Sequence, residues 1–186
     1  MTMCRPQEFY ECNSKRLRGK TFSFYDLVDH YMDDRGVLGY FDFWSGFNIP
    51  STMLEKFFSL HNDLNVRETK LRNITNPYKD KLYYVIASQK NDIDTLKHEL
   101  VHAHYFLNPV YKQEVNTIIK HMRPEIKSKL IIELSDLGYT KSVMSDEINA
   151  YMATSGLKYL KEEFDLKVTG KDIKPFVDLA KTVLRD

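Results

Sequence analysis

The most informative stretch of the chain reads Asp94-Thr-Leu-Lys-His98-Glu99-Leu-Val-His102-Ala-His104-Tyr-Phe-Leu107. Its apolar residues recur at helical spacing, so the pattern predicts a helix from Ile93 to Leu107 that ends at Asn108-Pro109. A helix returns to the same face after four residues. His98 and His102 are therefore expected side by side, about 6 Å apart along the helix axis.

This pair of imidazoles has the spacing of two ligands to one metal ion. Two histidines on one helical face can bind a single tetrahedral zinc ion at nitrogen–metal distances of about 2.0–2.1 Å. Glu99 is rotated by about 100° from His98, which suits a base acting on a metal-bound water rather than a third ligand. His104 is rotated by about 200° from His102 and is expected to be a hydrogen-bonded second-layer or surface histidine.

The same stretch also permits a simpler interpretation, an amphipathic core helix that carries two surface histidines. Its apolar residues would form a helix without any metal. The apolar or small positions are Leu96, Leu100, Val101, Ala103 and Leu107. The motif lies inside a predicted helix and directly after a predicted strand, and this context favours the metal site.

The motif and its flanks resemble the signature of the zincin superfamily of metallopeptidases. In that signature a Val or Thr is followed by uncharged positions around His-Glu-x-x-His, and the stretch from Thr95 to Ala103 matches it. His104 departs from the pattern, because the family usually has an apolar residue there. The resemblance covers Leu82 to Leu107. It implies an α+β, zincin-like fold with a small mixed or antiparallel sheet, an edge strand next to the active-site helix, and a mostly helical C-terminal part.

A catalytic zinc ion takes three protein ligands and a water, so a third ligand is needed. A metzincin-like third histidine would fall at Asn108, and that option fails. In the gluzincin option a glutamate comes from a later helix, and Glu147 is the best match. Ala150 and Ala153 follow it, and such small residues permit close packing onto the motif helix. The rivals without a small-residue face are Glu114, Glu125, Glu133, Asp146 and His121.

Glu147 has a purely local interpretation as well, because the helix macrodipole favours an acid in the first turn. Many gluzincins carry an aspartate four residues after the glutamate ligand, where it orients the first histidine. This chain has Tyr151 at that position. Metal-bound histidines usually donate their other N–H to a carboxylate or carbonyl, so the partner of His98 is not evident from the sequence.

The resemblance implies a zinc-dependent peptidase with one Zn²⁺ ion as cofactor and a peptide or protein as substrate. Glu99 is then the general base that takes a proton from a metal-activated water. Tyr151 and Tyr139 are candidates by residue type for a second donor to the developing oxyanion. An extended substrate can add as a further strand to the edge strand Leu82–Ser88.

Two other classes of function remain as alternatives. The first is a non-catalytic zinc-binding scaffold or regulatory module of zincin-like fold. Glu99 speaks against it, because a purely structural site has no use for that residue. The second is a nucleic-acid-binding regulator joined to a zincin-like domain. The near-neutral charge speaks against that class, and no nucleic-acid partner is expected.

Length and composition bound the class of protein. The 186 residues favour a single domain over residues 1–186, and 42% hydrophobic with 28% charged residues is ordinary for a globular chain. The net charge of +1 gives no reason to expect a polyanionic partner. The basic residues Lys15, Arg16, Arg18 and Lys20 are interpreted as a solvated surface segment.

Neither a secretory signal nor a membrane span is predicted. The N-terminus lacks a basic head followed by an apolar run, and no stretch approaches the roughly 18 apolar residues of a membrane helix. Cys4 and Cys12 form no Cys-x-x-Cys pair, which excludes the common redox and cysteine zinc motifs. The expected location is the cytoplasm, without a membrane partner.

The remaining elements follow from periodicity and from turn residues. Residues 1–21 are expected to be a polar lead-in, and residues 61–81 a polar stretch with a turn at Asn76-Pro77. Strands are predicted at Val37–Phe47 and Leu82–Ser88. Helices are predicted at 23–34, from about 51 to 60, and at 110–122, 124–137, 145–164 and 171–184.

Overall fold

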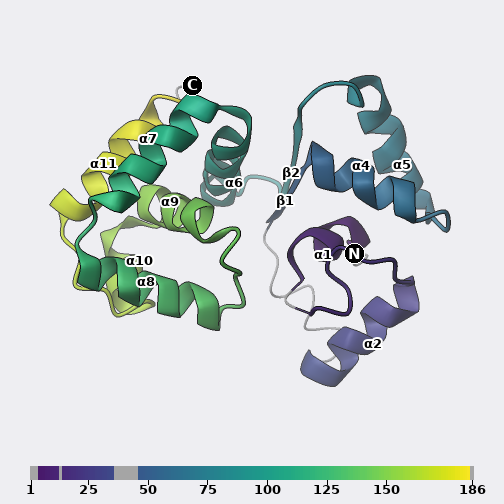
Figure 1. Cartoon of the computed structure of the whole chain (residues 1–186), viewed down its shortest axis with the longest axis horizontal. Helices are drawn as coiled ribbons and strands as arrows, with labels where there is room; N and C mark the ends of the chain where they lie inside the picture. The colour runs from purple at the N-terminus through teal and green to yellow at the C-terminus, as the bar shows by residue number, and fades with distance from the viewer. Residues whose placement is uncertain (1–3, 13, 36–45, 185–186) are drawn as a thin grey trace. The chain divides into compact units, whose positions relative to one another are not determined.

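Two short strands form a small antiparallel sheet in a chain that is otherwise mostly helical (Figure 1). The computed structural model describes residues 4–12, 14–35 and 46–184. Strand β1 (Gly46–Pro50) pairs with β2 (Tyr84–Ser88), with Gly46 opposite Ser88 and Pro50 opposite Tyr84. The α+β composition and the second strand are therefore confirmed. The strand predicted at 37–47 lies largely outside the described residues.

The chain divides into two compact units, Met1–Gln89 and Lys90–Asp186. Each unit has a hydrophobic core of its own. The expectation of a single domain is not decided by this division and stays a prediction.

The first unit contains helices α1 (Arg5–Glu11), α2 (Phe24–Arg35), α4 (Ser51–Leu60) and α5 (Val66–Thr75) beside the two strands. A 3₁₀ turn, η2 (Asn76–Tyr78), follows α5, as the Asn-Pro pair predicts. Helix α1 packs on α4 and on β1. The side chains of this core that are 0% exposed are Phe9, Leu17, Leu27, Ile49, Leu54 and Phe57.

Helix α1 lies where the sequence predicts only a polar lead-in. Arg5 at its start is 1% exposed, and its guanidinium donates to Glu68 through Nε at 2.7 Å and Nη2 at 2.6 Å. Glu68 in turn belongs to α5, within the stretch 61–81 for which the sequence predicts polar residues and a turn but no helix. A capping box between Asn65 and Glu68 starts α5. Arg5 and Glu68 are buried as an ion pair, and a pattern of polar and apolar residues does not predict such burial.

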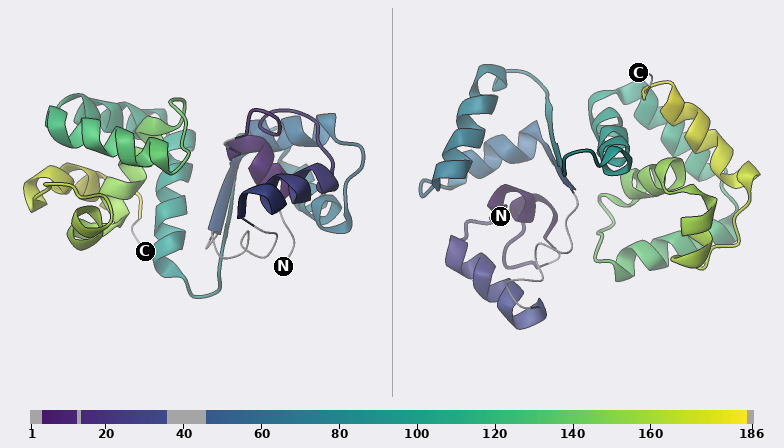
Figure 2. Two further views of the ribbon diagram at one scale, coloured as in Figure 1. Left: turned by 90° about the horizontal axis from the view of Figure 1, so that it is seen from below. Right: turned by 180° about the vertical axis from the view of Figure 1, so that it is seen from behind.

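In the second unit, all regular secondary structure within the described residues 90–184 is helical. It contains α6 (Ile93–Leu107), α7 (Pro109–Lys120), α8 (Pro124–Asp136), α9 (Met144–Thr154), α10 (Gly156–Glu162) and α11 (Gly170–Lys181). Helix α9 contacts all five of the others. Figure 1 shows it between α7 and α11 on one side and α8 and α10 on the other, and Figure 2 gives two further views.

Local sequence accounts for where these helices begin and end. Asp92 accepts a hydrogen bond from the Thr95 backbone N–H at 3.0 Å and caps α6. Asn108 ends α6 and accepts from the first backbone N–H groups of α7. The single helix predicted at 145–164 is wrong, because Gly156 has a φ of 75° and separates α9 from α10.

The helix ends predicted elsewhere in this unit agree with the structure to within a few residues. Among the helices of the described ranges, none combines the length and apolar character that crossing a bilayer requires.

Candidate metal centre

Helices α6 and α9 carry the predicted site, and small side chains let them pack closely. Val101 of α6 and Ala150 of α9 are each 0% exposed and pack with Ala180 of α11. Ala153 of α9 lies against the same cluster. The small-residue face expected beside Glu147 therefore does pack onto the motif helix.

This packing brings His98, His102 and Glu147 together. One ligand atom from each of the three side chains lies within 4.8 Å of the others. The Nε2 atoms of His98 and His102 are 3.2 Å apart, and His102 Nε2 lies 3.7 Å from Glu147 Oε2. The three side chains found together among the described residues are those named from the sequence as ligands: two histidines from one helix and a glutamate from a later one.

The donor set fits a divalent metal ion. Two nitrogens that share a tetrahedral zinc ion at about 2.0–2.1 Å lie about 3.3 Å from each other, close to the observed separation. No described residue donates a hydrogen bond to Glu147 Oε2, although this atom is buried. Buried acceptors that face one another without a donor are costly, and a bound cation removes that cost.

His102 has a carboxylate at its other ring nitrogen. Asp146 Oδ1 lies 2.9 Å from His102 Nδ1 as an ion pair, without the alignment of a good hydrogen bond, and the His102 side chain is 3% exposed. A carboxylate at this distance favours a proton on Nδ1, which leaves the Nε2 lone pair toward His98 and Glu147. Asp146, a rival for the third ligand, therefore contacts the ring edge that faces away from the group. Sequence reasoning missed this partner, although it directly precedes Glu147.

His98 has a hydroxyl where many gluzincins have a carboxylate. Its Nδ1 lies 3.0 Å from Thr154 Oγ1, and the Thr154 hydroxyl donates to the Ala150 carbonyl at 2.7 Å. Tyr151 lies four residues after Glu147, and its ring packs edge-on against the His98 ring at a centroid distance of 5.1 Å. A sequence signal for Thr154 does exist, since it follows Glu147 by seven residues, or two helical turns.

Glu99 and two tyrosines complete the surroundings. Glu99 is 7% exposed, and its carboxylate is close enough to raise the pKa of both His102 and Glu147. The Tyr139 hydroxyl hydrogen-bonds the Glu147 carboxylate and lies 3.5 Å from the Tyr151 hydroxyl. Burial raises the pKa of Tyr151 to about 12, so this phenol keeps its proton.

The pKa values of His98, His102 and Glu147 are shifted in different directions by their surroundings. Burial, together with the charge of His102, lowers the pKa of His98 to about 3. Burial also opposes charge on His102, but the carboxylates of Asp146 and Glu147 outweigh it and raise the pKa of His102 well above its usual value. Burial raises the pKa of Glu147 to about 8, against the attraction of His102. These effects disfavour a proton on His98 and favour one on His102 and on Glu147.

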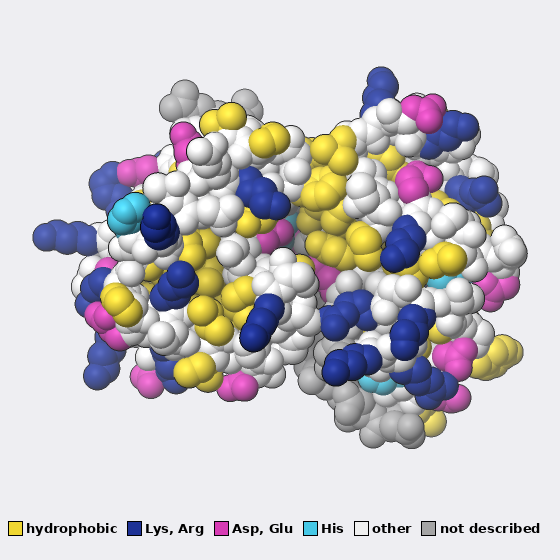
Figure 3. Space-filling model, in the orientation of Figure 1, with side chains coloured by type: hydrophobic (Ala, Val, Ile, Leu, Met, Phe, Trp, Pro, Cys, Tyr) yellow, Lys and Arg dark blue, Asp and Glu magenta, His cyan; other side chains and the backbone are white. Residues whose placement is uncertain are grey.

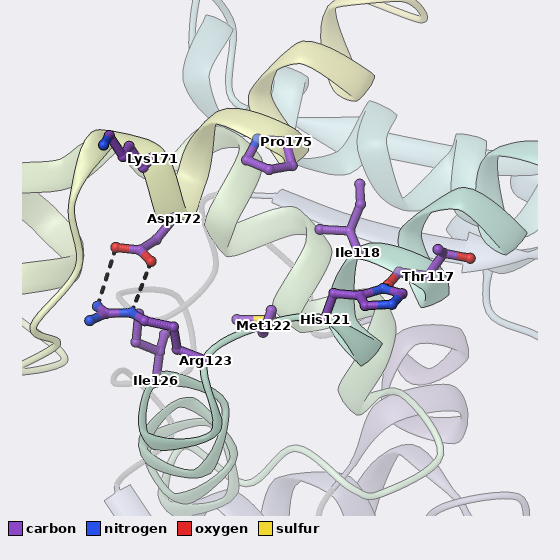
Figure 4. Close-up of a pocket in the computed structure, with 9 residues that line it drawn as sticks. All are labelled: Thr117, Ile118, His121, Met122, Arg123, Ile126, Lys171, Asp172 and Pro175. Carbon is purple, nitrogen blue, oxygen red and sulfur yellow. Dashed lines mark hydrogen bonds and ion pairs between the residues drawn. The ribbon is translucent and has the colours of Figure 1, made fainter.

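The other rivals for the third ligand lie elsewhere. His121 lines a separate pocket of about 330 Å³, and its Nδ1 lies 2.8 Å from the Thr117 carbonyl oxygen (Figure 4). In the same pocket Arg123 pairs with Asp172, at 3.0 Å between Nε and Oδ1. The lining contains none of the three clustered side chains. Glu125 pairs with Arg123 and Glu133 with Lys129, and Glu114 is exposed.

His104 is half-buried, and burial lowers its pKa. Its ring lies near Tyr111, at a centroid distance of 6.2 Å. His104 is therefore a packed histidine outside the three-residue group, in line with its rotation away from His102 on the helix.

The basic residues near the N-terminus are exposed or half-buried, as expected for a solvated segment. Arg16 of this group pairs with Asp26 at 2.9 Å between Nη2 and Oδ1. On the face drawn in Figure 3, several lysine and arginine side chains lie close together on the lower part of the first unit, and elsewhere basic and acidic side chains are interspersed.

No family model, curated protein or solved structure matches this chain.

Proposed function

We propose that this chain is a zinc-dependent peptidase of zincin-like fold. His98, His102 and Glu147 hold one zinc ion, and Glu99 is the general base. One observation carries the proposal: two imidazole Nε2 atoms face each other at 3.2 Å beside a buried carboxylate oxygen that no described residue satisfies. The zincin-like arrangement of an edge strand next to α6, with a peptide or protein as substrate, belongs to this proposal.

The chemistry assigns a task to each side chain. Zinc, when bound, supplies the Lewis acidity that polarises a peptide carbonyl and makes water a better nucleophile. Glu99 takes the proton of the attacking water on a carboxylate oxygen and passes it to the leaving amine. Tyr151, with Tyr139 beside it, supplies a phenolic O–H for the developing oxyanion.

Two features favour catalysis over a non-catalytic zinc module. Structural zinc sites are usually closed by four protein ligands, whereas the group contains three. Glu99 is a buried acid near the buried Glu147 and the partly buried Asp146, and this crowding of carboxylates is unfavourable for stability. A base in the reaction accounts for its presence, and a structural site does not.

The test is a pair of variants assayed for zinc content and for cleavage of a fluorescence-quenched casein. Glu99→Gln should bind one zinc per chain and lose peptidase activity by a factor of about 10²–10⁴, the usual contribution of a general base. His98→Ala should lose the metal and the activity together. Glu125→Gln, which alters an exposed glutamate, is the matched control and should change neither.

Each result separates two interpretations. A Glu99→Gln protein with full activity would exclude the proposed mechanism while the zinc site stands. A wild-type protein that holds zinc and cleaves nothing would favour the scaffold alternative. Glu147→Ala tests the third ligand, and unchanged zinc affinity in that variant would exclude Glu147 from the ligand set.

A further inference from the structure

The partner of His98 Nδ1 is the neutral side chain of Thr154. The single hydroxyl proton of Thr154 determines the direction of its hydrogen bonds. Thr154 ends α9, and its Oγ1 lies 2.7 Å from the Ala150 carbonyl oxygen and 3.0 Å from His98 Nδ1. A hydroxyl has one proton to donate and lone pairs to accept. The carbonyl can only accept, so the hydroxyl proton is committed to Ala150.

The committed hydroxyl decides which nitrogen of His98 carries the proton. Thr154 Oγ1 is left as an acceptor toward His98, and only an Nδ1–H can satisfy that contact. The Nε2 lone pair of His98 then points toward His102 Nε2, at 3.2 Å. This is the tautomer that binds a metal through Nε2.

We propose that Thr154 is a positioning residue of the metal centre, which holds His98 in its metal-binding tautomer. Its hydroxyl donates to the Ala150 carbonyl and therefore accepts from His98 Nδ1–H. The inference rests on the proposed function. It adds that the two histidines are oriented differently, His102 by the carboxylate of Asp146 and His98 by a backbone carbonyl through Thr154. The first histidine thus needs no aspartate four residues after Glu147, and Tyr151 can occupy that position.

Thr154→Val and Thr154→Ser separate this role from packing. Valine keeps the shape of threonine and removes the hydroxyl, whereas serine keeps the hydroxyl and removes a methyl group. Zinc affinity is measured by competition with a chelating dye. We expect Thr154→Val to bind zinc about 10- to 100-fold more weakly than wild type, the usual effect of losing such a partner. Thr154→Ser should restore most of the affinity.

A spectroscopic readout addresses the tautomer directly. In zinc-loaded wild type and Thr154→Ser, ¹⁵N-edited NMR should show a His98 Nδ1 proton protected from exchange with water. In Thr154→Val that protection should be lost. Thr75→Val is the matched control, because the buried Thr75 hydroxyl also donates to a carbonyl of its own helix, Leu71 at 3.1 Å, far from the three ligands in sequence. It should leave zinc affinity unchanged.

The outcomes are distinguishable. Zinc affinity equal to wild type in Thr154→Val would overturn the role of Thr154 and leave the metal centre intact. Weak binding in both Thr154→Val and Thr154→Ser would assign the residue to packing, which also overturns the proposal. A wild-type protein that takes up no zinc would overturn the metal centre and the role of Thr154 together.

Discussion

At the scale of single residues, the atoms by which His98, His102 and Glu147 face one another have no hydrogen-bond donor from another described residue. When they carry no proton, these atoms (His98 Nε2, His102 Nε2 and Glu147 Oε2) can only accept. The two histidines each have a partner at the other ring nitrogen, and no described residue donates to Glu147 Oε2. The raised pKa values of His102 and Glu147 favour the binding of protons by these two side chains.

Zinc must displace those protons, so binding should release them. The pKa of Glu147 is raised to about 8 and that of His102 lies well above its usual value, whereas His98, at about 3, is already neutral. Apparent zinc affinity should therefore rise with pH from 6 to about 8, because fewer protons remain to be displaced. Isothermal titration calorimetry at pH 7, in buffers of different ionisation enthalpy, should show net proton release.

His121→Ala is the control for this measurement, since His121 lines a separate pocket. It should leave the number of released protons unchanged. Zinc uptake without proton release, or with affinity that falls as pH rises, would contradict the assignment of His102 and Glu147 as protonated ligands.

The sequence predicts the part of the site that one helix determines. His98, Glu99 and His102 lie within five consecutive residues, so their relation follows from helical geometry alone. Glu147 required the additional argument that small residues allow two helices to approach. The spacing from Glu147 places Thr154 on the same helical face. Which ring edge Asp146 and Thr154 each contact was not predictable, because it depends on the angle and register of α9 against α6.

At the scale of elements, strong local signals were sufficient for α6 and β2 and insufficient for α1 and α5. Helix α6 has a capping aspartate, an apolar stripe and a terminating Asn-Pro pair. Helices α1 and α5 are short and polar, and the buried ion pair of Arg5 with Glu68 holds them in place. Such a pair joins residues far apart in sequence, so no local pattern reports it.

The break between α9 and α10 provides a test at this scale. Gly156 has a φ of 75°, a conformation that a side chain disfavours, and an added Cβ would meet no atom within 4 Å. Gly156→Ala should thus destabilise the protein through backbone strain alone, by about 1–2 kcal/mol. The measurement is the free energy of unfolding in urea.

Gly170→Ala is matched to this variant, because an added Cβ there also meets nothing within 4 Å while the backbone φ lies outside the left-handed region. It should be neutral or slightly stabilising, since alanine is the better helix former. Equal effects at the two glycines would show that the left-handed conformation does not set the boundary between α9 and α10.

At the scale of the whole molecule, each of the two units has a main hydrophobic core of its own, and the candidate metal centre found among the described residues lies in the second unit. All three proposed ligands belong to the second unit, in α6 and α9. The first unit is held by its own core and by the Arg5 network. A ligand that binds only the folded state stabilises the structure that forms its site, here the packing of α6 on α9.

Zinc should therefore protect specific helices against unfolding. At a free zinc concentration about 1,000 times the dissociation constant, the expected stabilisation is about 4 kcal/mol. Hydrogen exchange followed by mass spectrometry should show slower exchange in peptides that cover α6 and α9 when zinc is added, and a chelator should reverse the change. His98→Ala should remove the protection, because it deletes one ligand and leaves both helices able to form. Protection that survives in His98→Ala, or that is confined to β1 and β2, would show that zinc binds somewhere other than the group formed by α6 and α9.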